Sequence, residues 1–318
     1  MGWVFLIGVT LVLALWVPYN MSLGTLTTLV GLFVLIILAT TWNLLAGYGG
    51  MMSIGQQAFI GAGGYGLIKI TDLWGIPLPL ALLLCALVCA ALSFMTSFLV
   101  FRLVGGYFAI GTWVVAEVFK LVTTKFDALG GGSGMSLKAF QGVDRVDRVA
   151  TVYWMALGAC VLVVLSTYAL MRSRFGLALT AIRDNSTAAS SLGVSVPRVK
   201  RIVYVAAGAG AGLAGGLVAM NALRVTPDSI YSVNYSAFMI FIVVIGGLGT
   251  IEGPILGAIL FFALQQYLAD EGTTYLLVVG AVAILVVLFA RQGIWGILAG
   301  RQGYQVFNVG YRVREVDR

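Results

Sequence analysis

Long apolar runs restrict this chain more than any other feature of its sequence. Several reach the roughly 20 residues that an α-helix needs to cross a bilayer. Only 10% of the residues are charged, against about 25% in soluble globular proteins. The segments of a β-barrel would be shorter and would alternate with a period of two. We therefore expect an all-α polytopic membrane protein in which residues 1–318 form a single transmembrane domain.

Ten apolar segments are candidate membrane spans, which predicts about ten transmembrane helices. The first segment has no basic region before it and no small-residue cleavage site, so we expect a retained span rather than a signal peptide. The ten segments are residues 2–17, 25–45, 54–70, 78–101, 105–123, 151–171, 202–222, 236–250, 255–268 and 274–291.

Basic residues are concentrated in the loop 172–201 and in the tail 292–318. The positive-inside rule places both in the cytoplasm. Alternation over ten spans then places the N-terminus in the cytoplasm and residues 124–149 outside. The net charge of +7 is explained by this bias, which argues against nucleic-acid binding. A polar, basic loop between two spans predicts a docking surface for a cytoplasmic partner.

Three segments are rich in glycine and polar residues, namely 46–66, 105–112 and 245–257. Glycine allows helices to pack closely in a membrane. It also allows a helix to break, and irregular backbone survives at membrane depth where it is buried in protein or lines a cavity. Close packing and a translocation path lined by broken or re-entrant helices therefore both remain open. The glycine turns at 47–50 and 246–249 also suggest a weak internal repeat.

Uncharged polar residues lie in or beside these segments, where they either join helices by hydrogen bonds or line a polar pathway. An acid within an apolar span usually faces a cavity or a partner. For Glu117 the alternatives are an ion pair with Lys120, a gate, or proton coupling; Glu252 is expected to be solvated or to pair with a partner subunit. The candidate pathway residues are Asn43, Ser53, Gln56, Gln57, Thr112 and Glu117.

Several chemistries are excluded by missing residues. The chain has no histidine, which removes histidine-based acid–base catalysis and the common zinc-protease motif. Cys85, Cys89 and Cys160 lie in apolar spans, where we expect them to pack as small hydrophobic residues rather than bind metal. The chain also lacks a phosphate-binding P-loop. We therefore expect a non-enzymatic subunit without cofactors of its own, whose ATPase, if ATP drives it, is another polypeptide.

The chain resembles the permeases of branched-chain amino-acid ABC transporters, and specifically the second of their two paired permeases. The similarity runs in collinear order over about residues 30–300. The matching stretches are TWNLLAGYGGMMSIGQQAFIGAGGY (41–65), GGYFAIGTWVVAEVFKLV (105–122), GGSGM (131–135), SRFGLALTAIRDNSTAASSLGVSV (173–196), VVIGGLGTIEGPILGAI (243–259) and LVVLFARQGIWGIL (285–298).

This resemblance implies a type II-like half-permease in a bacterial-type inner membrane. It implies a homologous sister permease as heterodimer partner, two cytoplasmic ATPase subunits that bind ATP and magnesium, an extracytoplasmic solute-binding protein and surrounding lipid. The resemblance also makes residues 172–201 the coupling loop. In that loop Ala188, Ala189 and Gly193 would seat in the ATPase, with Arg183 and Asp184 on the flank.

Two departures from the family pattern bear on the ATPase contact and on the solute, in that order. Ser186 and Thr187 stand where many relatives carry an acidic residue, and Gln56 and Gln57 stand where many carry a histidine. Branched-chain amino acids are the expected solutes, with urea, short amides or other small solutes as the alternative. From a different class, an ATP-independent secondary transporter or channel also remains open. A membrane-embedded enzyme is disfavoured because clustered acids and histidine are missing.

Overall fold

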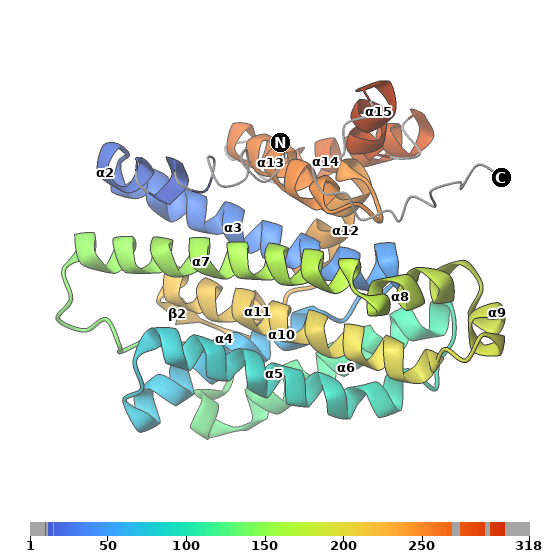
Figure 1. The fold of residues 1–318 in the computed structure, drawn as a ribbon. Coiled ribbons are helices and arrows are strands. Elements are labelled where there is room, and N and C mark those ends of the chain that lie inside the picture. The colour runs from blue at the N-terminus through green and yellow to red at the C-terminus, as the bar shows by residue number, and fades with distance from the viewer. Residues whose placement is uncertain (1–9, 11, 15, 269–273, 290–292, 303–318) are drawn as a thin grey trace.

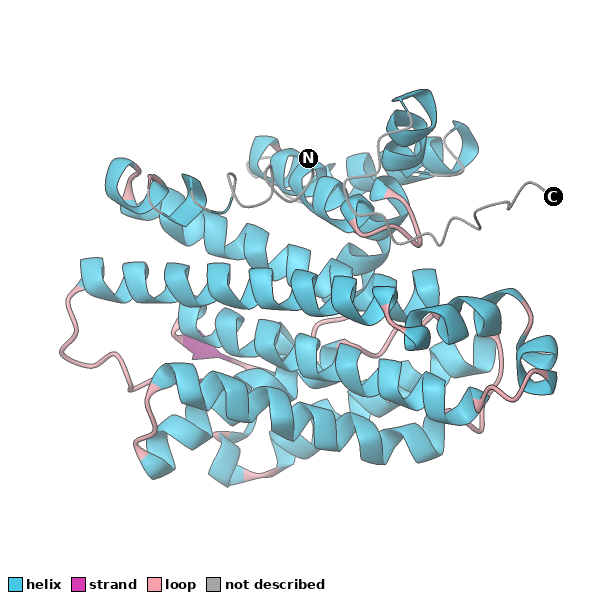
Figure 2. Ribbon diagram, in the orientation of Figure 1, coloured by secondary structure: helices cyan, strands magenta, loops and turns pink. Residues whose placement is uncertain are grey.

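The protein is a bundle of α-helices, seen in a computed structural model that describes residues 10, 12–14, 16–268, 274–289 and 293–302 (Figures 1 and 2). This confirms the all-α prediction. In chain order the elements are α2 (Val17–Asn20), α3 (Leu23–Asn43), the π-helical turn η1 (Leu44–Tyr48), α4 (Gln57–Trp74), α5 (Leu78–Val100), α6 (Gly106–Lys125), the 3-10 turns η2 (Asp127–Leu129) and η3 (Gly131–Ser133), β1 (Met135–Ser136), α7 (Arg145–Arg172), α8 (Arg174–Asp184), α9 (Ser186–Ser191), α10 (Val196–Ala222), β2 (Arg224–Val225), α11 (Pro227–Ile230), α12 (Asn234–Gly246), α13 (Glu252–Tyr267), α14 (Thr274–Phe289) and α15 (Gly293–Gln302).

Six helical stretches in the described residues are long and apolar enough to cross a membrane, fewer than the ten spans expected. α4 has 18 residues, but it includes four glycines, Lys69 and Asp72. α13 and α14 have 16 residues each, short of the roughly 20 that a full crossing needs. The first apolar segment, 2–17, lies almost entirely outside the described residues. The six stretches are Leu23–Tyr48, Leu78–Val100, Gly106–Lys125, Arg145–Arg172, Val196–Ala222 and Pro227–Gly246.

α10 forms the centre of the bundle, where it packs on α3, α4 and α5. Its packing face is built from small residues. A Cβ added at Gly215 would overlap the carbonyl oxygen of Ile60 on α4, and one at Gly212 would lie 2.6 Å from the sulfur of Cys89 on α5. Such close approach maximises van der Waals contact between helices, which stabilises helix association in a bilayer. The three cysteines are buried and free.

The two ends of the bundle are formed by different elements. α8 and α9 lie at one end, which we call the α8–α9 end (Figure 1). At the opposite end β1 pairs with β2 in antiparallel register, Met135 opposite Val225, and we call it the β-ribbon end. The loop 172–201 and the residues 124–149 thus lie at opposite ends, in agreement with the alternation predicted from charge.

Two of the three glycine-rich segments interrupt helices. Residues 49–56 are not helical and separate η1 from α4, while residues 247–251 separate α12 from α13. The third segment, 105–112, does not interrupt a helix. Only Gly105, with φ of 60°, lies in a turn, and residues 106–112 form the start of α6.

Candidate functional site at the junction of two helix breaks

The first helix break follows α3 and is held by side chains that bond to its exposed backbone. The indole nitrogen of Trp42 donates to the carbonyl oxygen of Ser53 (2.8 Å). The amide of Ile54 donates to Oγ1 of Thr112 on α6 (3.2 Å). Ser53 and Thr112 are fully buried. Backbone groups that lack helical hydrogen bonds must find other partners inside a bilayer, so the side chains of Trp42 and Thr112 stabilise the break.

Two buried glutamines mark the point where the chain re-enters a helix. Gln57 opens α4, and its side-chain amide lies within hydrogen-bond distance of the Ser236 hydroxyl on α12. Ser236 also contacts the carbonyl oxygen of Ile54 (3.1 Å). The amide of Gln56 is 1% exposed, and no group in the described part of the chain bonds to it. A buried polar group of this kind calls for an explanation, and Gln56 is therefore a candidate for contact with a solute.

The second helix break lies between α12 and α13. Thr250 closes this turn, because its hydroxyl donates to the carbonyl oxygen of Gly247 (2.9 Å) and accepts from the amide of Gly253 (3.1 Å). A Cβ on Gly246 would overlap the carbonyl oxygen of Gly253. Glycine is thus required for the end of α12 and the start of α13 to approach this closely.

Asn43 joins the two breaks. Its Nδ2 donates to the carbonyl oxygen of Thr250 (2.7 Å), and its Oδ1 accepts from the amide of Gly249 (2.9 Å). The side chain is 1% exposed. A Cβ on Gly47 would lie 2.6 Å from the backbone nitrogen of Gly249, so the two glycine turns are in direct contact. We call this site, formed by residues 43–50 and 246–253, the junction.

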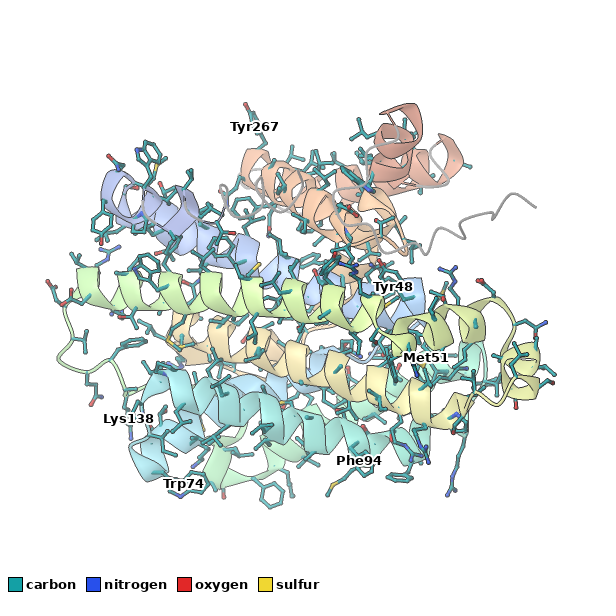
Figure 3. All side chains as sticks on the ribbon, viewed as in Figure 1. Tyr48, Met51, Trp74, Phe94, Lys138 and Tyr267 are labelled. Carbon is teal, nitrogen blue, oxygen red and sulfur yellow. The ribbon has the colours of Figure 1, made fainter. Side chains whose placement is uncertain are left out.

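Arg183 connects the junction to α8. Its Nη1 donates to the carbonyl oxygen of Gly47 (3.0 Å), and its Nε bonds to Oδ1 of Asp184 (3.0 Å). A Cβ on Gly249 would lie 3.3 Å from the same Nη1, and one on Gly50 3.3 Å from Cγ of Arg183. One side chain of the basic loop therefore touches both helix breaks. Figure 3 labels Tyr48 and Met51 in this part of the bundle.

The short helix α9 forms the tip of the loop. Asn185 caps it by accepting from the amides of Thr187 and Ala188 (3.1 and 3.0 Å). Ala188 is exposed, whereas Ala189 is 2% exposed, so Ala189 packs into its own chain and does not present itself to a partner. Gly193 has φ of 86°, a conformation that favours glycine, in agreement with the turn expected there.

The surroundings of two acidic residues, Glu117 and Glu252, differ from those expected. Lys120 forms its ion pair with Asp228 of α11 (2.7 Å) rather than with Glu117, because the loop before α12 brings that carboxylate to the end of α6. Glu117 is half-buried on α6, and its pathway role stays a prediction. Glu252 is 8% exposed; the expectation of a solvated side chain was wrong, because the break places it inside the junction.

Sequence reasoning missed three residues that matter here. Trp42 and Thr250 hold the two breaks by hydrogen bonds, and neither residue type is unusual in an apolar or glycine-rich segment. Leu192 is 83% exposed at the tip of the loop. The signal for Leu192 was present in its sequence, since a leucine flanked by Ser191 and Gly193 in a polar loop has no apolar neighbour on which to pack.

Comparison with known proteins identifies relatives over most of the chain. The "High-affinity branched-chain amino acid transport system permease protein LivM" of Salmonella typhimurium is 30% identical over 91% of this chain and 74% of its own length. The protein of the same description from Escherichia coli strain K12 is 31% identical over 89% of this chain and 73% of its own length. A "Probable branched-chain amino acid transport permease protein LivH" of Methanocaldococcus jannaschii is 29% identical over 41% of the chain and 42% of its own length.

No solved structure matches the chain. Residues 24–288 match the model of the family described as "Branched-chain amino acid transport system / permease component". That range contains every helix from α4 to α13, both helix breaks, Asn43 and Arg183. The chain therefore belongs to the branched-chain amino acid transport system permease family.

Proposed function

We propose that this chain forms half of the translocation pathway of an ATP-driven importer for branched-chain amino acids. Its partners would be a homologous sister permease, two cytoplasmic ATPase subunits that carry ATP and magnesium, and an extracytoplasmic solute-binding protein. Family membership and the LivM relatives support the solute class. The chain would be a type II-like half-permease with about ten spans in a bacterial inner membrane.

The contact of Arg183 with Gly47 is the observation that carries this proposal. A subunit driven by an external ATPase needs a direct connection between its docking loop and the helices that move. Arg183 provides that connection, because it lies on α8 and bonds to the first break while contacting the second. A hydrogen bond from a charged donor contributes about 1.5–3 kcal/mol, enough to transmit a displacement of α8 to both breaks.

The exposed face of α9 is the proposed ATPase contact. Ala188 and Gly193 leave room for a closely seated partner, and Leu192 offers an apolar side chain to it. Arg183 and Asp184 lie beside this face. Ala189 would support α9 from beneath, since it is buried in its own chain. The α8–α9 end would therefore face the cytoplasm, with both termini on that side.

The proposed pathway runs beside the first break. Gln56 and Gln57 supply buried amides there, and Ser53 and Thr112 hold the backbone around them. Asn43 would fix the position of the second break rather than touch the solute. Glu117, in the middle of α6, is retained as a candidate.

The experiment is solute uptake in vesicles that contain both permeases and the ATPase, with the solute-binding protein added. Arg183→Gln is expected to reduce uptake per ATP hydrolysed by about tenfold, which corresponds to about 1.4 kcal/mol. The matched control is Arg198→Gln, which removes the same charge from an exposed position at the same end. Uptake by the control should change less than twofold.

Three outcomes would contradict the proposal. If the Arg183 and Arg198 variants take up the same amount of solute per ATP hydrolysed, the contact between Arg183 and Gly47 has no role in coupling. Stimulation of ATP hydrolysis by urea or acetamide, but not by leucine or valine, would favour the amide-transporting branch. Uptake driven by an ion gradient without any ATPase would favour a secondary transporter.

A further inference from the structure

A second polar site lies at the β-ribbon end, away from the junction. It is a groove of about 700 Å³ between the first turns of α3, the last turn of α10, the start of α12 and the end of α13. We call it the polar groove. Its volume lies in the range of small-molecule sites, about 300–1,000 Å³, and exceeds that of a free amino acid.

The lining of the polar groove combines uncharged polar groups with an apolar wall. No Asp, Glu, Lys or Arg is among the described residues that line it. Asn221 of α10 and Gln265 of α13 both line the groove, and Phe238 and Phe262 supply aromatic surface. Uncharged hydroxyl and amide groups can hydrogen-bond both ends of a zwitterion, and the aromatic wall suits an aliphatic side chain.

The polar groups of the groove offer both acceptors and donors. The hydroxyls of Thr27 and Thr28 each donate to a carbonyl oxygen one turn earlier in α3 (2.9 Å in both cases). Their oxygen lone pairs are then available as acceptors for an ammonium group. In the described part of the chain, no hydrogen bond holds the side-chain amides of Asn221 and Gln265, so their N–H groups can donate to a carboxylate.

Three helices connect the polar groove to the junction. α3 begins at the groove and ends at Asn43, α12 begins at the groove and ends at Gly246, and α13 runs back from Glu252 to the groove (Figure 1). α3 is 21 residues long, or roughly 31 Å at about 1.5 Å per residue. A tilt of these helices at the junction would therefore change the width of the groove.

We propose that the polar groove is the outer vestibule that receives the solute, and that it takes a small zwitterion with an apolar side chain. This inference rests on the proposed function and deepens it. It assigns the solute's entry site to α3, α10, α12 and α13 of this chain. The charged groups nearest in sequence, Arg224 and Asp228, are outside the lining, which leaves the neutral character of the site intact.

The test uses single added cysteines and a membrane-impermeant maleimide on the assembled transporter. The three native cysteines are buried, so the wild type supplies the unreactive background. Asn221→Cys and Gln265→Cys are placed in the groove. The matched control is Tyr267→Cys, two residues further along α13, 91% exposed and outside the lining.

All three added cysteines should react from outside. Labelling of the two groove cysteines should reduce valine uptake by at least about tenfold, because the adduct occupies the entry site of a small molecule. The labelled control should keep its uptake rate within about twofold of the unlabelled control, since its adduct lies outside the groove. Excess valine should slow labelling at Gln265→Cys, and excess lysine or glutamate should not. Gln265→Glu should raise the KM for valine, and Tyr267→Glu should leave it unchanged.

Full uptake after complete labelling of both groove cysteines would overturn the inference. So would groove cysteines that react in the isolated chain but not in the assembled transporter, because the sister permease would then cover the groove. Failure of the proposed function is seen separately, since it would show as absent valine uptake in the unlabelled wild type. Labelling of the groove with uptake of another solute would keep the vestibule and change only the solute class.

Discussion

The junction and the polar groove lie at opposite ends of the same three helices and are built in opposite ways. At the junction, glycines bring backbone against backbone, and the Asn43 side chain, from the end of α3, bonds to two backbone groups of the second break. In the groove, side chains line an open space, and a Cβ added at Gly31 would meet nothing within 4 Å. A transport subunit needs one end that transmits a displacement rigidly and another that stays open to a solute.

The largest difference expected between the two ends is in stability, when one glycine at each end is replaced by alanine. Gly246→Ala would push a Cβ into the carbonyl oxygen of Gly253, and backbone cannot rotate away as a side chain does. We expect a loss of about 3 kcal/mol or more of stability and little assembled protein. Gly31→Ala should be neutral or slightly stabilising, since alanine favours a helix over glycine by about 1 kcal/mol.

Thermal unfolding of the two purified variants in detergent, followed by size-exclusion chromatography, measures this difference. Gly158→Ala on α7 serves as a second reference, because its Cβ would also meet nothing within 4 Å. Equal melting temperatures for the Gly246 and Gly31 variants would mean that the junction is not closely packed.

A smaller effect is expected from the polar residue that joins the breaks. Asn43→Ala would leave the amide of Gly249 and the carbonyl of Thr250 without their partner. Leaving buried polar groups unsatisfied costs about 1–3 kcal/mol. Asn43→Asp should lie between wild type and alanine, because a carboxylate still accepts from Gly249 but cannot donate to Thr250.

Urea unfolding monitored by tryptophan fluorescence gives the free energy of unfolding for this series. The control at the other end is Asn221→Ala in the polar groove, for which we expect a change below about 0.5 kcal/mol, as for most surface positions. A larger loss at Asn221 than at Asn43 would reverse the proposed roles of the two ends.

The smallest effect concerns the ion pair beside the polar groove. Lys120 and Asp228 lie 2.7 Å apart, with side chains 30% and 85% exposed. Exposed pairs contribute about 0–1 kcal/mol and are screened by salt. Asp228→Asn should therefore lower the melting temperature by no more than a few degrees, with a smaller difference in 1 M salt. A difference that grows with salt would exclude an ion-pair origin.

Several features of the fold could be predicted because they depend on local composition. The apolar runs predicted helices in a membrane, and the glycine density at 46–66 and 245–257 indicated either close packing or a helix break, of which the structure shows breaks. At 105–112 the same glycine density gives no break, since Gly105 alone forms the turn and the helix continues through Gly111. A cluster of glycines indicates either a break or a close contact, and only the neighbouring helices decide which.

The candidate site was predictable in its residue types but not in its contacts. Asn43 and Arg183 were both singled out, yet assigned to a pathway and to an ATPase surface. The structure brings them to one place, where Asn43 bonds to Gly249 and Arg183 bonds to Gly47. Their partners lie 206 and 136 residues away in the chain, a separation that no local pattern records.

The sequence by itself determined that this chain is helical and crosses a membrane, that it carries a basic loop and three glycine-rich segments, and that it belongs to a permease family. Those properties follow from hydrophobic length, charge bias and short motifs, which act locally along the chain. Only the tertiary structure decided that the two breaks touch, that Ala189 and Glu252 face inward, and that uncharged residues from four helices form one groove. Those outcomes depend on how closely helices distant in sequence can pack, which is decided by side-chain shape across the bundle.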